Sequence, residues 1–551
     1  MEKIWLKRYP PNVPTEIDPD QYRSLVEIFD RSCCQFGRRL AFASMDYGMS
    51  YAELEQASRA FAAWLQHHLG LEKGERVAIM LPNLLQYPVA LFGALRIGLV
   101  VVNINPLCTP HELEHRLQDS GARVILILAN LAHVLAEVIE RTEIRMTIVT
   151  EVGDLLPYWK ARVVNLVARH IKKTVPSYAL PNAVAFKEAL SDGTHLSLRR
   201  VAVSGEDLAF LQYTDGTTGL SKGVMLTHRN MLANVRQMTA WVGAMVREGQ
   251  EVVITALPMY HLFCLTVNCL CFLHLGGLNV LVANPRDPAL LVREMCRWKC
   301  SVIAGADALY GALLDNDKFN TLDFTSLRLA VGVGVAVRRS VAEHWRVLTG
   351  IPILEGYGLT EASPVICANP VDIEDFSGSV GLPVPSTEVR LCDEGGREVP
   401  LGERGELYVR GPQVMRGYWR NPEETARILR EGWLLTGDIA TANEQGFFRI
   451  VGRKKDLIAV SDTDVFPSEI EEMVVACPGV LEAICIGVPD EKSGKAVKLF
   501  VVPKPGIELS IEKILAYCGQ RLTAYGLACH IEFRDSLPKS SAGKILRHAL
   551  R

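Results

Sequence analysis

The stretch from Tyr213 to Gly223 reads Y-T-D-G-T-T-G-L-S-K-G and carries residue types that suit a polyphosphate. Glycines let the backbone turn its N–H groups inward, threonine hydroxyls add donors, and Lys222 supplies a point charge. The stretch is not a Walker P-loop, because Ser221 stands where a second glycine should precede the lysine. A Gly/Ser/Thr-rich surface turn is the alternative interpretation. The stretch therefore indicates phosphate binding, and the other motifs must decide.

A second polar cluster, Glu355–Glu361, reads E-G-Y-G-L-T-E and follows an apolar strand. Its tight loop holds an aromatic ring, a hydroxyl and a carboxylate. An aromatic ring can stack on a purine, a hydroxyl can bind a phosphate oxygen, and a carboxylate can hold Mg²⁺. The alternative is a glycine-rich loop around a buried tyrosine.

Three shorter clusters follow at long separations. Trp433–Asp438 ends in an aspartate that could accept hydrogen bonds from two ribose hydroxyls, or form a plain Asx-turn. Gly452–Asp456 (G-R-K-K-D) places three cations between apolar strands, where a charged turn is the alternative. Leu537–Lys544 holds a lysine in a Gly/Ser turn near the chain end.

The elements that must position these clusters alternate between strand and helix. Unbroken Val/Ile/Leu runs predict buried strands at Arg76–Leu81, Val100–Asn103, Val124–Leu128 and Met146–Thr150. Such runs, separated by helices, are typical of α/β folds with mainly parallel sheets covered on both faces. A chain of 551 residues is too long for one core and should form several units.

The later part of the chain changes character. Alternating strands and closely spaced turns from Thr387 to Gly417 predict a small β-rich, barrel-like subdomain. From Asp456 onward we expect a compact α+β unit. Its predicted pieces are the helices Pro467–Val475 and Ile511–Leu522 and the strands Ala483–Val488, Val497–Val502 and Ile531–Arg534.

Composition excludes several classes of protein. A net charge of -3 is a poor match to an electrostatic nucleic-acid binder. The fourteen cysteines are scattered without a C-x-x-C pair, which favours buried thiols in a reducing compartment. The N-terminus lacks the apolar region of a secretory signal, and polar residues interrupt Leu262–Leu281, which we expect to be a buried helix and strand. These features predict a cytoplasmic protein.

Leu155–Pro181 has apolar residues every fourth position among lysines and arginines. A basic amphipathic helix of this kind can lie on an anionic membrane surface. A solvated surface helix over the domain is the simpler interpretation.

The five motifs, in text, order and spacing, resemble the adenylate-forming superfamily of acyl-CoA synthetases, peptide-synthetase adenylation domains and firefly luciferase. The likeness runs from about Trp5 to Arg551. Details resemble the bacterial long-chain fatty acyl-CoA ligases more narrowly, namely Leu84–Gly93, Asn103–Pro106, Leu257–Phe263 and Glu532–Asp535. The resemblance implies a large N-terminal domain of two αβ-layered sheets with the β-rich subdomain at about 380–452, spanning 1–454. It also implies a mobile α+β lid, 455–551.

The resemblance implies an ATP-dependent acid–thiol ligase, using Mg²⁺ and CoA, that forms a fatty acyl-adenylate and then a thioester. Cofactor-binding positions would be Tyr213, Thr214, Gly216, Thr217, Thr218, Gly219, Lys222, Gly356, Tyr357, Asp438 and Arg453. Among these, Thr214, Thr217, Thr218 and Lys222 would wrap the β- and γ-phosphates, Tyr357 would flank adenine, and Asp438 and Arg453 would bind the ribose. Catalytic positions would be Lys544, Thr360 at the α-phosphate and Glu361 as Mg²⁺ ligand. Lys455 matches the hinge, and His261, Val333 and Asp462 match the acyl and CoA tunnel.

Several residues depart from the family pattern along the ligand path. Asp215 adds a negative charge beside the phosphates, and Val333 puts a β-branched side chain where backbone approaches ligand. Asp307 replaces an Asn near the acyl tunnel, where an unpaired carboxylate would disfavour an aliphatic chain. Asp462 replaces a glycine of the pantetheine tunnel, and Gly526–Cys529 replaces a more basic turn. These changes suggest retained adenylation with altered chain length or CoA transfer.

Two alternatives to a fatty acid–CoA ligase stay open. The acyl group could pass to the phosphopantetheine of a carrier protein. A diverged paralogue with impaired thioester formation could instead act as a ligand-binding protein, although the charged groups that adenylation needs are all present. The sequence is compatible with peripheral association with an anionic membrane and with a homodimer.

Overall fold

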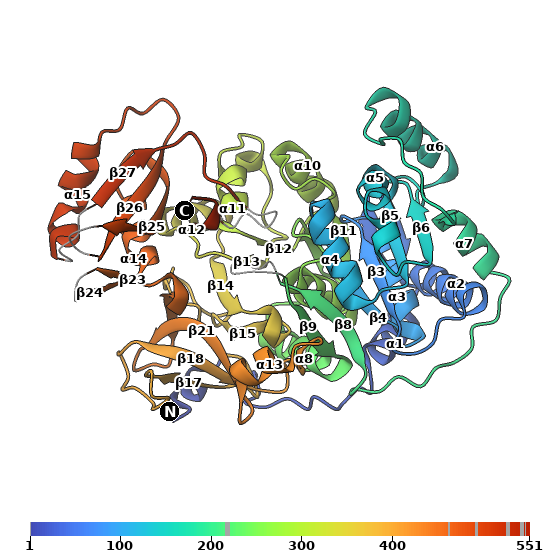
Figure 1. Ribbon diagram of the computed structural model, residues 1–551, viewed down its shortest axis with the longest axis horizontal. Coiled ribbons are helices and arrows are strands. Elements are labelled where there is room, and N and C mark those ends of the chain that lie inside the picture. The colour runs from blue at the N-terminus through green and yellow to red at the C-terminus, as the bar shows by residue number, and fades with distance from the viewer. Residues whose placement is uncertain are drawn as a thin grey trace. The chain divides into compact units, whose positions relative to one another are not determined.

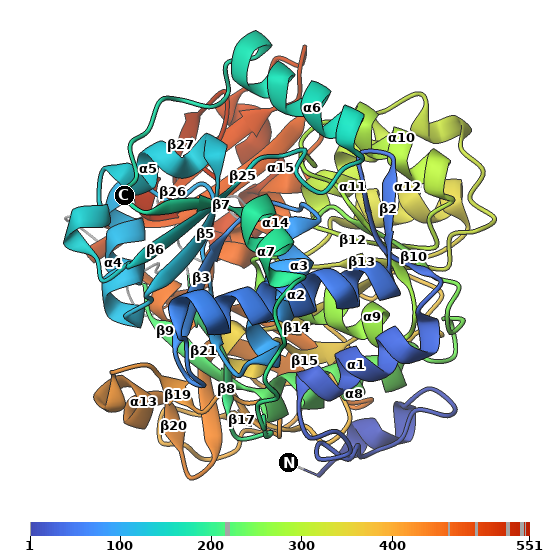
Figure 2. The same ribbon diagram turned by 90° about the vertical axis from the view of Figure 1, so that its right-hand side faces the viewer.

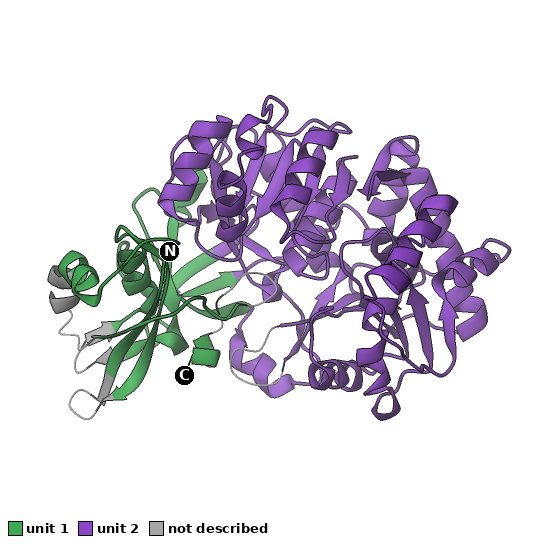
Figure 3. Cartoon of the chain, turned by 90° about the horizontal axis from the view of Figure 1, so that it is seen from above, with its two compact units in different colours: residues 1–8, 389–409, 433–551 green, residues 9–388, 410–432 purple. Residues whose placement is uncertain are grey.

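The computed structural model describes residues 2–214, 221–460, 463–490, 494–524, 529–539, 545 and 547–550. The chain divides into two compact units, which Figure 3 distinguishes by colour. Unit 1 comprises residues 1–8, 389–409 and 433–551, and unit 2 comprises residues 9–388 and 410–432. The predicted domain boundary at residues 454/455 stays a prediction, because the two compact units are divided differently. Unit 1 combines the β-rich segments before residue 454 with the C-terminal part of the chain.

The described residues of unit 2 contain a sheet of eight strands. Its order is β19 (Gly417–Tyr418), β9 (Gly223–Thr227), β8 (Leu208–Tyr213), β4 (Val100–Asn103), β3 (Arg76–Met80), β5 (Val124–Leu128), β6 (Met146–Thr150) and β7 (Ala183–Ala185). The strands from β8 to β7 are parallel, whereas β9 and β19 are antiparallel to their neighbours. The polar motif after Tyr213 therefore follows the carboxyl end of a parallel strand.

Helices cover both faces of this sheet (Figure 1 and Figure 2). One face carries α2 (Tyr51–Leu69), α3 (Gln86–Arg96) and α7 (Phe186–Gly193), and the other carries α4 (Pro110–Ser120) and α5 (Ala132–Ala136). Side-chain caps begin two of them, Ser50 with Glu53 at α2 and Thr109 with Glu112 at α4. Each capping box satisfies backbone N–H groups that the first turn leaves open.

A second sheet of unit 2 has nine described strands. Its order is β16 (Leu382–Pro383), β15 (Val365–Ala368), β14 (Ile353–Gly358), β13 (Leu329–Gly332), β12 (Val302–Gly305), β10 (Val252–Thr255), β11 (Leu278–Leu281), β1 (Leu40–Ser44) and β2 (Tyr47–Ser50). The strands from β14 to β1 are parallel. Trp345 of α12 (Arg339–Thr349) and Tyr310 of α11 (Asp307–Leu314) meet edge-on in its core, with ring centroids 4.8 Å apart.

Unit 1 contains an antiparallel β-rich part and an α+β part. The first pairs β18 (Gly405–Arg410) with β21 (Trp433–Ala442) and β21 with β22 (Phe448–Arg453). The second consists of α14 (Pro467–Val475) and α15 (Ile511–Ala524) with a sheet of β25 (Val480–Asp490), β26 (Gly494–Pro503) and β27 (Cys529–Phe533). The N-terminal turn η1 (Ile4–Arg8) belongs here because the fully buried Trp5 packs against Phe448, with ring centroids 6.3 Å apart.

The predicted fold class is confirmed, since both units have the expected α/β and α+β character. The buried strands β4, β5 and β6 and helix α14 match their predicted bounds. Leu262–Leu281 forms a largely buried helical segment, the π-helix η5 (Cys264–Cys271) followed by α9 (Phe272–His274), and then β11, as expected. Among the described residues, no helix is both long and apolar enough to cross a membrane.

A buried histidine of unit 2 makes the stability of the fold sensitive to acid. His228, the first residue of α8 (His228–Val242), is fully buried, and its Nδ1 accepts a hydrogen bond from the Leu25 N–H (3.2 Å). Burial lowers the pKa of His228 to about 4. Because the unfolded chain takes up this proton near pH 6.5, the stability contributed by the neutral ring is lost as pH falls from about 6.5 toward 4.

Replacing His228 by asparagine should reduce this acid sensitivity, because Asn retains an acceptor for the Leu25 N–H and does not titrate. Between neutral pH and pH 5 we expect the wild type to lose about 2 kcal/mol more unfolding free energy than H228N. Urea unfolding at the two pH values measures the difference. Equal losses in both proteins would contradict the assignment.

Candidate active site

The base of the Tyr213–Gly223 loop is a hairpin between β8 and β9. Tyr213 faces Gly223 in the register, and the Thr214 N–H donates to the Lys222 carbonyl (3.1 Å). The Tyr213 hydroxyl is buried and donates to Asp119 of α4 (2.5 Å). The predicted phosphate-binding residues Gly216, Thr217, Thr218 and Gly219, and the variant Asp215, lie outside the described residues. Their roles stay predictions, but the hairpin fixes both ends of their loop.

Lys222 emerges from this hairpin into a polar cluster. Its Nζ lies 2.5 Å from Oε1 of Glu424, on the short helix α13 (Pro422–Ile428), and 5.3 Å from the centre of the Tyr418 ring. Tyr418 comes beside Lys222 because β19 pairs with β9, aligning Tyr418 with Val224. The ammonium is therefore held by one carboxylate and one aromatic face.

The Glu355–Glu361 motif joins the same cluster. Gly356 and Tyr357 lie on β14, and Thr360 and Glu361 begin the turn η7 (Thr360–Ala362). Gly358 is required between them, since a Cβ there would lie 2.1 Å from the Pro364 carbonyl oxygen. The Tyr418 hydroxyl donates to Oε1 of Glu361 (2.7 Å), and the Met415 N–H donates to the Glu361 carbonyl (2.8 Å). Lys222 and Glu361, 139 positions apart, are thus both in contact with Tyr418.

The Glu361 carboxylate is suited to act as a magnesium ligand. It is partly exposed and accepts a hydrogen bond from a neutral donor, and it forms no ion pair with another described residue. The described residues contain no group of three or more metal-ligating side chains. A single carboxylate, with phosphate oxygens and waters as the other ligands, is how proteins commonly hold Mg²⁺.

In unit 1, the two predicted ribose-binding residues are brought together. Asp438 on β21 faces Arg453 on β22 in the register, and the Arg453 Nε lies 3.2 Å from Asp438 Oδ1. Asp438 is only 3% exposed, whereas the Arg453 side chain is about a third exposed. The predicted hinge, Lys455, is exposed in the turn η8 (Lys454–Asp456). Lys544 and Asp462 lie outside the described residues, so their roles stay predictions.

Two predicted acyl-tunnel residues, Val333 and His261, lie in loops that follow strands of the nine-stranded sheet, β13 and β10. Val333 follows β13, is 7% exposed and donates its N–H to Gly305 (3.0 Å). The His261 ring lies 4.7 Å from that of Tyr260. Asp307 is paired, since its carboxylate accepts from the Arg338 Nε (2.8 Å) and backbone N–H (2.9 Å). An unpaired carboxylate at this position was expected to disfavour an aliphatic acyl chain. Because Asp307 is paired with Arg338, that reason no longer applies.

Three residues of the cluster were not predicted as site residues. Tyr418, Glu424 and Asp119 contact Lys222, Glu361 or Tyr213 through side chains. The sequence shows the helix start at Asn421-Pro422, where Asn421 Oδ1 accepts from the Glu424 N–H (3.1 Å). This signal locates α13, but nothing in the sequence places Glu424 opposite a lysine 202 positions away.

Comparisons with known proteins agree with this geometry. A family model described as AMP-binding enzyme matches residues 29–419, more than half of the chain, and its C-terminal domain model matches residues 469–544. The chain belongs to the AMP-binding enzyme family. The family assignment predicted from the five motifs is therefore confirmed.

Similar members of the AMP-binding enzyme family cover nearly the whole chain. The chain is 53% identical over 551 residues to a long-chain-fatty-acid–CoA ligase of Escherichia coli O6:H1, which covers 100% of this chain and 98% of that relative. Among solved structures, the anthranilate CoA ligase AuaEII in complex with anthranoyl-AMP has a TM-score of 0.85 at 25% identity, covering 97% and 98% of the two chains. ATP-bound MatB from Rhodopseudomonas palustris has a TM-score of 0.80 at 28% identity, covering 96% and 98%.

In this AMP-binding enzyme, removing the charge of Glu424 should strengthen ATP binding. Arg427 (2.6 Å) and Lys222 hold the pKa of Glu424 below its usual range, so the carboxylate is charged and competes with phosphate for Lys222. A partly exposed ion pair is worth about 1 kcal/mol, so E424Q should lower the Kd for ATP about fivefold. Isothermal titration calorimetry measures the change. R427Q is the matched control, since Arg427 pairs with Glu424 without touching Lys222, and an equal gain there would contradict the prediction.

Proposed function

We propose that this protein activates a long-chain fatty acid in two steps. The fatty carboxylate attacks the α-phosphorus of ATP, which forms acyl-adenylate and releases pyrophosphate. The sulfur of CoA then attacks the acyl carbon, which forms the thioester and releases AMP, while the thiol proton passes to solvent. The observation that carries the proposal is the cluster in which Lys222, Tyr418 and Glu361 meet beside the hairpin of the phosphate-binding motif.

The residues of this chain are assigned roles by their chemistry and by the family pattern. Lys222, with the loop threonines, neutralises the β- and γ-phosphates, and Thr360 donates to the α-phosphate. Tyr357 stacks on adenine, and Asp438 accepts from the ribose hydroxyls with Arg453 beside it. No general base is needed, because a fatty carboxylate is already ionised and nucleophilic at neutral pH.

Mg²⁺ is proposed as the companion of ATP, with Glu361 as its protein ligand. The ion would neutralise phosphate charge when bound. Tyr418 contributes by orienting the carboxylate: burial and the nearby Glu361 carboxylate raise the pKa of Tyr418 well above its usual range, so its hydroxyl stays a donor at working pH. We further propose a cytoplasmic enzyme that binds the periphery of an anionic membrane.

A panel of carboxylates of increasing chain length tests the proposal. Pyrophosphate release and acyl-CoA formation are measured for each acid with ATP, Mg²⁺ and CoA. We expect both products in equal amounts, with the highest kcat/KM for long chains. Pyrophosphate without acyl-CoA would point to a carrier-protein acceptor or to an impaired thioester step, as the substitutions Asp462 and Gly526–Cys529 suggest. Binding of ATP without pyrophosphate from any acid would overturn the enzymatic proposal.

A further inference from the structure

The helix α6 (Tyr158–Leu166) and the π-helical segment η4 (Val167–Ile171) that continues it expose an apolar surface. Trp159 is 69% exposed, Val163 and Leu166 are each 55% exposed, and Ile171 is 68% exposed. Spacings of four and three residues place Trp159, Val163 and Leu166 along one side of the helix. The segment lies at the edge of unit 2, beyond β6 and α7 (Figure 1 and Figure 2). We call this side, from Trp159 to Ile171, the apolar stripe.

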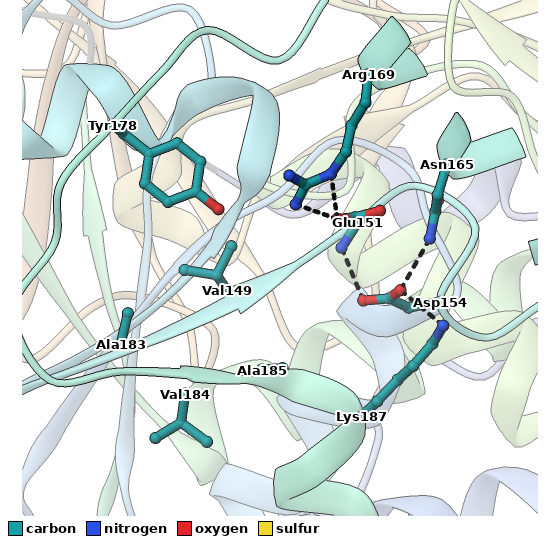
Figure 4. A pocket seen from close by; sticks show the side chains of 10 residues that line it. All are labelled: Val149, Glu151, Asp154, Asn165, Arg169, Tyr178, Ala183, Val184, Ala185 and Lys187. Atoms are coloured by element: carbon teal, nitrogen blue, oxygen red, sulfur yellow. Dashed lines mark hydrogen bonds and ion pairs between the residues drawn. The ribbon is translucent and has the colours of Figure 1, made fainter. Parts of the chain in front are cut away.

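The inner side of the same segment is attached by polar contacts. Asn165 Oδ1 accepts from the Gly153 N–H (2.8 Å), and Asn165 Nδ2 donates to Asp154 (3.2 Å). Arg169 forms an ion pair with Glu151. An open cavity of about 360 Å³ lies between the segment and strands β6 and β7. Asn165, Asp154, Arg169 and Glu151 are among the residues that line it (Figure 4).

This orientation is the reverse of an ordinary surface helix, which buries its apolar side on the core. Five of the fourteen exposed large apolar side chains in the described chain lie between residues 158 and 171. Leaving them in water costs free energy, at roughly 25 cal/mol per Å² of apolar surface. The segment is a solvent-exposed surface helix, as the simpler interpretation has it, but its large apolar side chains lie on the solvent side. A surface that covered the stripe would remove this cost.

The charges around the stripe identify its partner. From residue 155 to residue 187 the chain contains no Asp or Glu, although its net charge is -3. Lys160, Arg169 and Lys187 pair with acids of unit 2. Within the described residues, Arg162, Lys172 and Lys173 have no acidic partner, and the Arg162 guanidinium lies over the Tyr158 ring, 4.7 Å from its centre. Exposed Trp and Tyr, a wide apolar side and unpaired cations are typical of helices that lie in the plane of an anionic bilayer.

We propose that α6 and η4 dock on the surface of anionic phospholipids, with the apolar stripe among the acyl chains and Arg162, Lys172 and Lys173 near the headgroups. The inference deepens the proposed membrane-peripheral location and names its surface. Long-chain fatty acids partition into bilayers, so docking places the enzyme where this substrate class is concentrated. Acids short enough to stay in water need no such docking.

Vesicle flotation with the full chain tests the proposal. We expect binding to mixed phosphatidylcholine–phosphatidylglycerol vesicles that weakens with added salt, and little binding to pure phosphatidylcholine. Trp159 provides a local probe because it is 69% exposed, whereas four of the other seven tryptophans are buried and three, Trp298, Trp419 and Trp433, are only partly exposed. Brominated lipids should quench wild-type fluorescence and should lose most of this effect in W159F. Absence of Trp159 quenching on bound vesicles would overturn the proposal.

Two variants separate the apolar and ionic parts. W159Q/V163Q/L166Q should lower vesicle affinity at least about tenfold, and K172Q/K173Q should lower it about tenfold on anionic vesicles only. V347Q is the matched control, since Val347 of α12 is 85% exposed but lies outside the stripe. Unchanged binding of the triple variant would overturn the proposal. A second result would also overturn it: the wild type forms a dimer in analytical ultracentrifugation, the triple variant does not, and neither protein binds vesicles.

Turnover distinguishes this surface from the catalytic proposal. In the triple variant, kcat/KM for a water-soluble short-chain acid should stay unchanged, while kcat/KM for a vesicle-borne long-chain acid should fall. A protein that binds vesicles through Trp159 but releases no pyrophosphate with any acid would refute the proposed function and leave the docking surface intact. Active turnover without vesicle binding would do the opposite.

Discussion

Replacing Lys544 by alanine is expected to abolish acyl-adenylate formation while leaving ATP binding largely intact. Negative charge gathers on the α-phosphate and carboxylate oxygens as the carboxylate attacks, and a compact ammonium placed there stabilises the transition state more than the ground state. Removing one such group typically costs about 10²–10³-fold in kcat. Single-turnover pyrophosphate release measures the rate, and calorimetry measures ATP binding.

The chain offers a matched control for Lys544→Ala. Lys539 lies five residues upstream in the same polar stretch, but its ammonium pairs with Glu482. K539A should therefore release pyrophosphate at close to the wild-type rate. If K544A also kept wild-type release, the role assigned to Lys544 would be refuted. If both variants lost activity together, the effect would belong to the stability of this segment and not to charge in the transition state.

Strands of unit 2 followed closely from the sequence because their environment is uniform. β4, β5 and β6 are largely buried on both faces, so most of their positions are apolar and the apolar run locates the strand. Strands of the C-terminal sheet were predicted too short. β25 and β26 pair over Val480–Asp490 and Gly494–Pro503, since antiparallel backbone pairing continues beyond the apolar run that periodicity detects.

The candidate site was predictable where a motif is local and unpredictable where distant segments meet. Glycine-rich loops can be recognised in the sequence. They made it possible to select Tyr213, Lys222, Tyr357 and Glu361 as candidate site residues. Glu424 could not be selected in this way, because its contact with Lys222 depends on β19 pairing with β9. The ion pair of Asp307 with Arg338 likewise joins two elements, so the substitution looked unfavourable until its partner was visible.

The orientation of α6 shows a further limit of periodicity. The pattern from Leu155 to Pro181 correctly predicts an amphipathic helix over part of its length. Periodicity shows that a helix has an apolar side and a polar side, but it does not show which of the two sides faces the core. Polar anchors such as Asn165 and Arg169 decide that, and their partners lie on a different segment, Glu151–Asp154.

Replacing Glu361 by glutamine is expected to lower pyrophosphate release about 100-fold and to raise the Mg²⁺ concentration needed for half-maximal rate. The amide keeps the shape of the side chain and an oxygen that can accept from the Tyr418 hydroxyl, so the contact of 2.7 Å can persist. What is lost is the negative charge, which a hard divalent cation requires more than shape. A Mg²⁺ titration of the initial rate at saturating ATP measures both effects.

Tyr418→Phe separates charge from orientation at the same position. It removes the donor to Glu361 but keeps the carboxylate and the aromatic face beside Lys222. A hydrogen bond to a charged group is worth about 1.5–3 kcal/mol, and a partly exposed one belongs near the lower end, so we expect about a tenfold loss or less. The Mg²⁺ requirement should shift less than in E361Q. An unaltered Mg²⁺ requirement in E361Q, with the rate reduced, would place the cation elsewhere and leave Glu361 as a structural acceptor for Tyr418.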